Sequence, residues 1–164
     1  MIPSCMRSMF SYSDWANGMV LSACASLSDA QLDEAVNMGP GTLRRIVTHT
    51  YNGEFVWLAR WKGQVETAWP SEKVATPVGA LATAFEVLRA DRERWLAGLD
   101  GAALEREQTY RDSRGSLYRA KLGDMLLQGL VHSIHHRAQA VNAIKRVGGP
   151  VLEVDYMMRL REPV

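Results

Sequence analysis

Three of the four histidines lie within five residues of one another, in the segment LLQGLVHSIHHRAQAVNAIKRVGG (126–149). His132 and His136 are four residues apart, so on a helix they project from the same face about one turn apart. This spacing lets one helix offer two imidazoles to one metal ion. A metal site needs a further ligand, and His49 is the only histidine outside this segment. His49, His132 and His136 are therefore the candidate metal ligands, and zinc and nickel both suit imidazole donors.

Small residues accompany these histidines. Gly129 and Ala143 fall on the same predicted helix face as His132, where they leave space for a metal ion or let another helix approach closely. Gly53 lies one turn after His49, and a glycine inside a helix costs roughly 0.5–1 kcal/mol relative to alanine. Its presence indicates a close approach or a cavity beside His49.

Three further polar residues of the same segment carry alternative interpretations. His135 is rotated about 60° from His132, away from His136, and we expect it at the rim of the site rather than among the ligands. Gln139 either orients an imidazole or is an ordinary packing or surface amide. Arg137 either pairs with an acidic group and supports helix packing or is a solvated surface charge. An alternative interpretation of the histidines is that they are hydrogen-bonded core or surface residues that bind no metal.

Hydrophobic periodicity predicts the elements that position these residues. We expect four long helices, over about 5–26, 43–62, 78–98 and 121–147. Ser28 and Thr42 are predicted N-caps, and the glycines and prolines at 39–40 and 148–150 are predicted stops. The tail VDYMMRLREPV (154–164) is predicted to form a last helical turn or two.

The other segments complete the expected architecture. Residues 63–77 are a predicted loop, and 108–120 are predicted to form a short β-hairpin or an extended excursion. On the last long helix, the face opposite the histidines is the predicted core stripe, with Leu126, Leu130, Ile134, Val141 and Ile144. Trp57, Trp61 and Trp95 are interpreted as packing residues. The fold class is all-α, a four-helix bundle, in a single domain over 1–164.

Composition limits the function classes. Nearly half of the 164 residues (47%) are hydrophobic, which suffices for a substantial core, and the net charge of +1 gives no electrostatic footprint for DNA or RNA. No apolar run approaches the roughly 20 residues of a membrane span, and the N-terminus lacks the apolar region of a secretory signal. Cys5 and Cys24 form no metal or redox motif, so we expect free thiols in a reducing cytoplasm.

The last long helix also bears on partners. Over most of its length it carries little charge on either face. We expect such a helix to pack on both sides, with one side facing its own bundle and the other meeting a neighbouring helix or a second subunit. This pattern predicts a homodimer.

At these residues the chain resembles the DinB/YfiT-like family, whose signature helix carries His-x-x-His-His-Arg-Gly-Gln. The chain has HSIHHRAQ (132–139), with Ala138 in place of the usual glycine. YSDWAN (12–17), the stretch 43–60 with His49 and WLAR, and DYMMRLR (155–161) are similar to other parts of the family pattern. The match is strongest at 10–62 and 121–161.

The resemblance implies a four-helix bundle with an up-down-down-up order, usually dimeric, with a divalent metal held by three histidines. Carried over by position, these are again His49, His132 and His136. It also implies, for some relatives, a metal that activates a low-molecular-weight thiol for transfer or isomerisation, whereas many relatives have no known activity.

Two hypotheses of different classes follow. In the first the protein is a metal-dependent enzyme, because three neutral imidazoles leave an open coordination position where the pKa of a water or a thiol is lowered. In the second it is a non-catalytic binding or structural dimer, a stress-response protein with a metal site. No general base is evident, since Glu54 lies roughly 140° around the helix from His49. No catalytic residue is therefore assigned.

Overall fold

Four long helices form the body of the computed structural model, which describes residues 1–72 and 75–162. They are α1 (Ser4–Ala25), α3 (Leu43–Trp61), α4 (Val78–Ala97) and α5 (Leu122–Arg146). The shorter elements are α2 (Asp29–Leu32), the 3-10 helix η1 (Ala102–Glu105), β1 (Glu107–Arg111), β2 (Leu117–Lys121) and α6 (Tyr156–Leu160). The predicted fold class is confirmed, and each predicted long helix agrees with an observed one to within about two residues.

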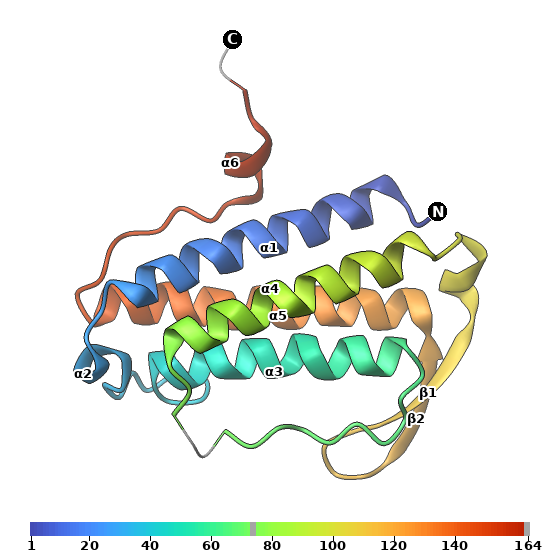
Figure 1. Cartoon of the computed structure of the whole chain (residues 1–164), viewed down its shortest axis with the longest axis horizontal. Helices are drawn as coiled ribbons and strands as arrows, with labels where there is room; N and C mark the ends of the chain where they lie inside the picture. Colours follow the sequence, from blue (N-terminus) through green and yellow to red (C-terminus); the bar gives the residue numbers. More distant parts are fainter. Residues whose placement is uncertain (73–74, 163–164) are drawn as a thin grey trace.

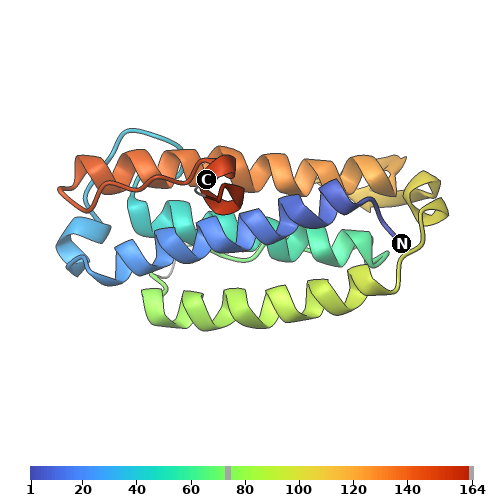
Figure 2. The ribbon, with the colours of Figure 1, turned by 90° about the horizontal axis from the view of Figure 1, so that it is seen from above.

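The helices follow the expected up-down-down-up order. In Figure 1, α1 and α5 run in one direction while α3 and α4 run in the other. Around the bundle each helix contacts two neighbours, in the order α1, α5, α3 and α4. Figure 2 shows the same arrangement from above, with α5 and α4 on opposite sides. Because α3 and α4 are parallel, the connection between them returns along the length of the bundle (Figure 1).

The helix ends use the predicted caps. The side chain of Thr42 accepts a hydrogen bond from the backbone N–H of Arg45, and Ser28 and Gln31 form a capping box before α2. Gly148 adopts a φ of 79°, a left-handed conformation that glycine enters without strain, directly after the C-cap residue of α5. These local signals fix the helix ends that the sequence predicts.

The core has two hydrophobic clusters separated by polar side chains. One cluster lies toward α2 and contains Leu43, Ile46 and Ile144, while the other lies toward the hairpin. The second contains Trp61 and Leu126. Between them along the helices is a set of mostly buried polar residues that we call the polar layer: Ser13, Asp14, Asn17, Glu54, Arg92, Ser133 and Arg137.

The buried face of α5 differs from the predicted core stripe. Leu126, Leu130 and Ile144 are buried as expected, but Ile134 is 38% exposed and Val141 is only partly buried. The interior positions between them are filled instead by residues of the polar layer and by Ala140. The prediction for Ile134 was wrong because α1 supplies polar partners that make a serine and an arginine stable inside the bundle.

The remaining segments agree with the sequence. Strands β1 and β2 pair antiparallel with Tyr110 opposite Tyr118, so the predicted hairpin is confirmed. Helix α6 is the predicted turn of the tail, and it is held against α1 where the hydroxyl of Tyr12 donates to the carbonyl oxygen of Val154. Both cysteines are free. Among the described residues, no helix has the length and apolar character needed to cross a membrane.

Candidate metal centre

His49, His132 and His136 converge at the interface of α3 and α5. The ring centroids are 4.4 Å apart for His49 and His136, 4.5 Å for His132 and His136, and 5.4 Å for His49 and His132. One ring nitrogen from each residue lies within 4.8 Å of the other two. We call these residues the histidine cluster. The structure thus brings together the three residues that the sequence singles out.

The hydrogen bonds of the rings show which nitrogens are spare. Nδ1 of His49 lies 2.8 Å from Oε1 of Glu72, and Nδ1 of His136 lies 2.8 Å from Oε1 of Gln139. These contacts leave Nε2 of both rings without a protein partner among the described residues. Nδ1 of His132 is buried and likewise has no hydrogen-bond partner within the described chain. Imidazole nitrogens gathered without protein partners match the donor set of a divalent transition metal.

Burial favours the neutral form of two rings of the cluster, His132 and His136. It lowers the pKa of His132 to about 4, with further contributions from the neighbouring rings of His136 and His49. Burial also lowers the pKa of His136, although the hydrogen bond with Gln139 opposes this effect. Neutral imidazole is the form that binds metal, so both rings are in the ligand form at neutral pH.

Gly53 explains how the two helices come close enough. A Cβ at this position would lie 2.2 Å from Cε1 of His132, so any side chain would displace the ring. The predicted close approach is confirmed. Gly129 and Ala143 have other roles: Gly129 makes space for the ring of Trp61, and Ala143 is buried in the hydrophobic cluster near α2. Of the two predicted roles, leaving space for a metal was therefore wrong, because both residues face packing residues. The other, close approach of a second helix, is confirmed for Gly129, which lies against Trp61 of α3.

A carboxylate outside the helices supports His49. Glu72 lies on the connection between α3 and α4, and its Oε1 also accepts hydrogen bonds from Asn52 Nδ2 (3.3 Å) and Trp69 Nε1 (2.6 Å). Burial alone would raise the pKa of Glu72, but the hydrogen bonds from Trp69, His49 and Asn52 outweigh it and lower that pKa. The carboxylate is ionised and committed to its donors. A carboxylate on the far nitrogen of a ligand histidine fixes the ring and raises its basicity.

Sequence reasoning missed Glu72, Trp69 and Asn52. Two of them lie in the predicted loop, where no periodicity indicates which side chains turn inward. Trp69 packs on the cluster, with its ring centroid 4.7 Å from that of His49 and 6.2 Å from that of His132. The only available signal was a tryptophan followed by a proline and a glutamate within a polar connection. This signal is too weak to predict which of these side chains contacts His49.

Gln139 and His135 form the outer edge of the cluster. Nε2 of Gln139 lies 3.0 Å from Nε2 of His135, while its Oε1 contacts His136. His135 is exposed. Gln139 therefore orients an imidazole, one of its two predicted roles, and His135 occupies the predicted position at the rim.

A cleft of about 500 Å³ opens beside the cluster. It is bounded by α3, α5, the connection that carries Trp69, and the β1–β2 hairpin. His132 contributes to its wall, together with aromatic residues and a few polar side chains: Trp57, Arg60, Trp69, Tyr110, Asp112, Asp124 and Gln128. We call this space the histidine cleft. Its volume is that of an ordinary small-molecule site.

The polar layer is separate from this cleft. Glu54 accepts hydrogen bonds from Asn17 (2.7 Å), Ser133 (2.6 Å) and Arg92 (3.1 Å). Arg137, 2% exposed, donates to Ser13 Oγ and Asn17 Oδ1 and stacks over Tyr12. Arg137 thus supports helix packing, which was one of its two predicted roles. Its partners are a hydroxyl, an amide and an aromatic ring, and not the predicted acidic group.

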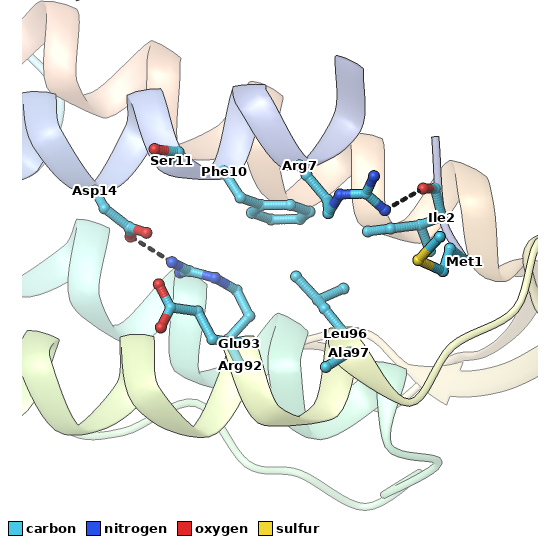
Figure 3. Close-up of a pocket in the computed structure, with 10 residues that line it drawn as sticks. All are labelled: Met1, Ile2, Arg7, Phe10, Ser11, Asp14, Arg92, Glu93, Leu96 and Ala97. Carbon is cyan, nitrogen blue, oxygen red and sulfur yellow. Dashed lines mark hydrogen bonds and ion pairs between the residues drawn. The ribbon is translucent and has the colours of Figure 1, made fainter. Parts of the chain in front are cut away.

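Figure 3 shows the outer part of the polar layer, where Asp14 of α1 meets Arg92 of α4 at the end of a cavity of about 380 Å³. Burial raises the pKa of Asp14 to about 6 against the opposing effect of Arg92. No histidine lines this cavity. The carboxylates of the polar layer are occupied by arginine and amide donors, which agrees with leaving Glu54 unassigned as a general base.

The sequence matches the model of a known protein family. A model of the DinB family matches residues 1–163. The chain belongs to the DinB family. The match includes the region between 62 and 121, where the sequence resemblance was weak.

Two solved structures share the fold. A DinB-like protein from Bacillus cereus superposes with a TM-score of 0.73 at 20% identity, over 92% of this chain and 95% of that chain. YfiT from Bacillus subtilis superposes with a TM-score of 0.68 at 21% identity, over 90% and 91%. YfiT is described as a probable metal-dependent hydrolase with an unusual four-helix bundle topology. No curated protein is significantly similar to the chain.

Proposed function

We propose that this DinB-family protein is a divalent-metal-dependent enzyme, with His49, His132 and His136 as the ligands. The observation that carries the proposal is the convergence of three imidazoles, with nitrogens that no described protein group satisfies, beside an open cleft. Three protein ligands with one open position is the usual arrangement of catalytic zinc sites, whereas structural sites are closed by four. Zinc and nickel remain the two proposed metals.

A divalent ion in this position would lower the pKa of a water or thiol that occupies its open coordination site. The protein's own residues would orient the ligand rings and limit the access of water. Glu72 and Gln139 hold the rings of His49 and His136 in place, so that little reorganisation is needed on binding. Trp69 covers the rings and limits access of bulk water from its side.

For the reaction, we propose transfer or isomerisation through a low-molecular-weight thiol. The family resemblance supports this choice, and so does the state of Glu72, the carboxylate in contact with the cluster, which is held by three hydrogen-bond donors. A thiol ionises more readily than water, and therefore depends less on a neighbouring general base. Hydrolysis is the second candidate, because YfiT is described as a probable metal-dependent hydrolase.

The test is turnover by the metal-loaded protein. Zinc- and nickel-loaded samples would be screened with small thiols and electrophilic acceptors, and in parallel with ester and amide substrates without thiol. We expect turnover that requires both metal and thiol and that is lost in His136→Ala. Turnover without thiol would favour hydrolysis. Metal binding without turnover in either screen would favour the alternative, a non-catalytic stress-response dimer with a metal site.

We also propose that the protein is a homodimer. Leu127, Val131 and Ile134 recur at helical spacing on the outer side of α5 and are 50%, 59% and 38% exposed. An exposed apolar stripe of this kind is typical of a helix that packs against a second copy. We expect a dimer in light scattering at micromolar concentration and a monomer for Val131→Glu. A wild-type monomer under these conditions would contradict the proposal.

A further inference from the structure

An arginine in the histidine cleft has no carboxylate partner. Arg60, in the last turn of α3, is only 7% exposed. Its Nη2 donates to the carbonyl oxygen of Arg111 at 2.7 Å, while its Nε is buried and unpartnered among the described residues. No carboxylate of the described chain lies within ion-pair distance of it. Most of its hydrogen-bonding capacity is therefore unused.

The other buried arginines make more hydrogen bonds or ion pairs than Arg60, although Arg92 and Arg137 each also have one unpartnered nitrogen among the described residues. Arg44 pairs with Asp29 and Asp33, and Arg92 pairs with carboxylates of the polar layer. Arg137 lacks a carboxylate but lies inside the bundle, where a hydroxyl and an amide accept its hydrogen bonds. Arg60 alone among these four lines the cleft beside the histidines. A buried charge without a partner is costly, so its position indicates a partner that comes from outside the chain.

Aromatic rings fix the plane of this guanidinium. Its Cζ lies 4.8 Å from the ring centroid of Trp57 and 5.1 Å from that of Tyr110. Burial lowers the pKa of Arg60, but an arginine remains charged at neutral pH. A planar, held guanidinium with free N–H groups fits the two oxygens of a carboxylate, which it binds through two parallel hydrogen bonds.

The charges around the cleft favour a single negative charge on the ligand. Asp112 and Asp124 also line it. Oδ1 of Asp112 accepts hydrogen bonds from the backbone N–H groups of Arg114 and Ser116, each at 2.9 Å, so this carboxylate is held by the hairpin turn and does not reach Arg60. Two nearby carboxylates repel a phosphate dianion about twice as strongly as a carboxylate monoanion.

The position of Arg60 along α3 relates it to the histidine cluster. Arg60 follows Gly53, the residue against the ring of His132, by seven residues. At a rise of 1.5 Å per residue, its Cα lies about 10 Å further along the helix. One small molecule in the cleft can therefore extend from His132 to Arg60.

We propose that Arg60 binds a carboxylate of the substrate, and that the substrate's apolar body lies along Trp57 with its reacting end at the histidine cluster. The proposed carboxylate site is inferred from the contacts of Arg60 alone and does not depend on a bound metal. The placement of the reacting end rests on the proposed metal-dependent function.

The first experiment tests the carboxylate site without chemistry at the metal. Hexanoate and hexanamide, equal in length, would be titrated into ¹⁵N-labelled protein in metal-free and zinc-loaded form, while the indole N–H signals of Trp57 and Trp69 are followed by NMR. We expect hexanoate to bind at least about tenfold more tightly than hexanamide in both forms. Equal affinities, or no binding of hexanoate at millimolar concentration, would overturn the proposal. Tighter binding of hexyl phosphate would overturn the assignment to a carboxylate.

Variants locate the effect at Arg60. Arg60→Gln should abolish the preference for hexanoate, and Arg60→Lys should keep part of it, since the charge remains but the planar fork is lost. Arg114→Gln, an equal change of charge at an exposed position outside the cleft, is the matched control and should bind as the wild type does. Retained preference in a folded Arg60→Gln variant would overturn the proposal. If that variant fails to fold, the lysine variant and the wild-type comparison still decide.

A second experiment tests the link to the metal. Cobalt-loaded protein would be titrated with 6-mercaptohexanoate and 6-mercaptohexanamide while the visible spectrum of the metal is recorded. We expect both thiols to change the spectrum, with the acid about tenfold tighter and this advantage lost in Arg60→Gln. Equal affinity of the two thiols would overturn the proposed orientation. If neither thiol changes the spectrum, the thiol chemistry of the proposed function fails, while the hexanoate titration still decides the role of Arg60.

Discussion

The histidine cluster and the polar layer lie at the same level of the bundle and differ in how their polar atoms are satisfied. In the polar layer, the acceptors of Glu54 receive donors from three other helices, and Arg92 joins two carboxylates. In the histidine cluster, the supporting residues occupy one nitrogen of His49 and one of His136, and the nitrogens on the other side have no partner within the described part of the chain. Most polar atoms of the layer are satisfied within the fold, although Nε of Arg92 and Nη2 of Arg137 also lack partners among the described residues. Groups that satisfy one another hold helices together, whereas imidazole nitrogens gathered at one point fit an external ligand.

The largest expected effect separates the two regions through stability. Glu54→Ala leaves Arg92 with one fewer carboxylate and removes the acceptor for Asn17 and Ser133. Breaking a buried ion pair in this way should lower the free energy of unfolding by about 3–5 kcal/mol, measured by urea denaturation. Metal affinity should not change. Loss of metal at unchanged stability would show that Glu54 belongs functionally to the cluster and would break the comparison.

The second effect concerns the ligands themselves. His136→Ala should weaken metal binding more than about 100-fold, which corresponds to more than about 2.7 kcal/mol. His135→Ala, its exposed neighbour, should weaken it far less. Metal content after dialysis, measured by elemental analysis, decides between them. If the two variants retain equal metal, the assignment of His136 as a ligand is wrong.

The third effect concerns the support of His49 by the connection between α3 and α4. Glu72→Ala should reduce metal affinity about 10–100-fold, because the ring of His49 loses its hydrogen-bonded carboxylate. Glu66→Ala is the matched control on the same connection, since Glu66 is exposed and pairs with Arg111. Calorimetric titration with zinc measures both. An equal loss in the two variants would assign the effect to the segment as a whole instead of to Glu72.

The smallest effect is a pair of opposite pH dependences in the metal-free protein. The pKa of Asp14 is raised to about 6, so the folded state binds more protons than the unfolded state between its usual 3.8 and 6, and stability falls as pH rises through this window. The pKa of His132 is lowered to about 4, so the unfolded state binds more protons between 4 and 6.5, and stability rises with pH. Each shift corresponds to about 3 kcal/mol at full value. Because the two contributions oppose one another, the net change in stability with pH is smaller than either.

Variants can isolate each contribution to the pH dependence. Asp14→Asn should remove the falling contribution and leave a steeper rise in the free energy of unfolding from pH 4 to 6.5. His132→Gln should do the reverse. Urea denaturation at several pH values measures both slopes. Slopes that change in the same direction in the two variants would contradict the assigned pKa directions.

What the sequence predicts well is what periodicity and caps encode. The helices of the bundle follow from apolar spacing and from residues such as Thr42 and Gly148, whose roles are local. The pair His132 and His136 follows from helix geometry, and His49 follows because no other histidine is available. The close approach at Gly53 could also be predicted, because a glycine inside a helix is destabilising and therefore indicates a local requirement for space.

What the sequence does not predict depends on neighbours far along the chain. Arg137 and Ser133 face inward because α1 brings Ser13 and Asn17 to them, and this contact also displaces Ile134 toward the surface. Glu72 and Trp69 lie in a connection without a repeating pattern, so only the path of that connection places them on His49. Arg60 follows the helical pattern of α3, but its missing partner is a property of the assembled cleft.

The parallel direction of α3 and α4 has a consequence for how the site is tethered. A chain that leaves one end of α3 must travel about 28 Å, the length of its 19 residues, before α4 can begin. A long crossover connection is thus required by the topology. Near its middle, Trp69 and Glu72 contact the histidine cluster. A bundle with short hairpin turns would have no such connection. Binding of an ion would therefore stabilise the position of the crossover as well as of two helices. The resistance of residues 62–72 to proteolysis should increase with the fraction of protein that has metal bound.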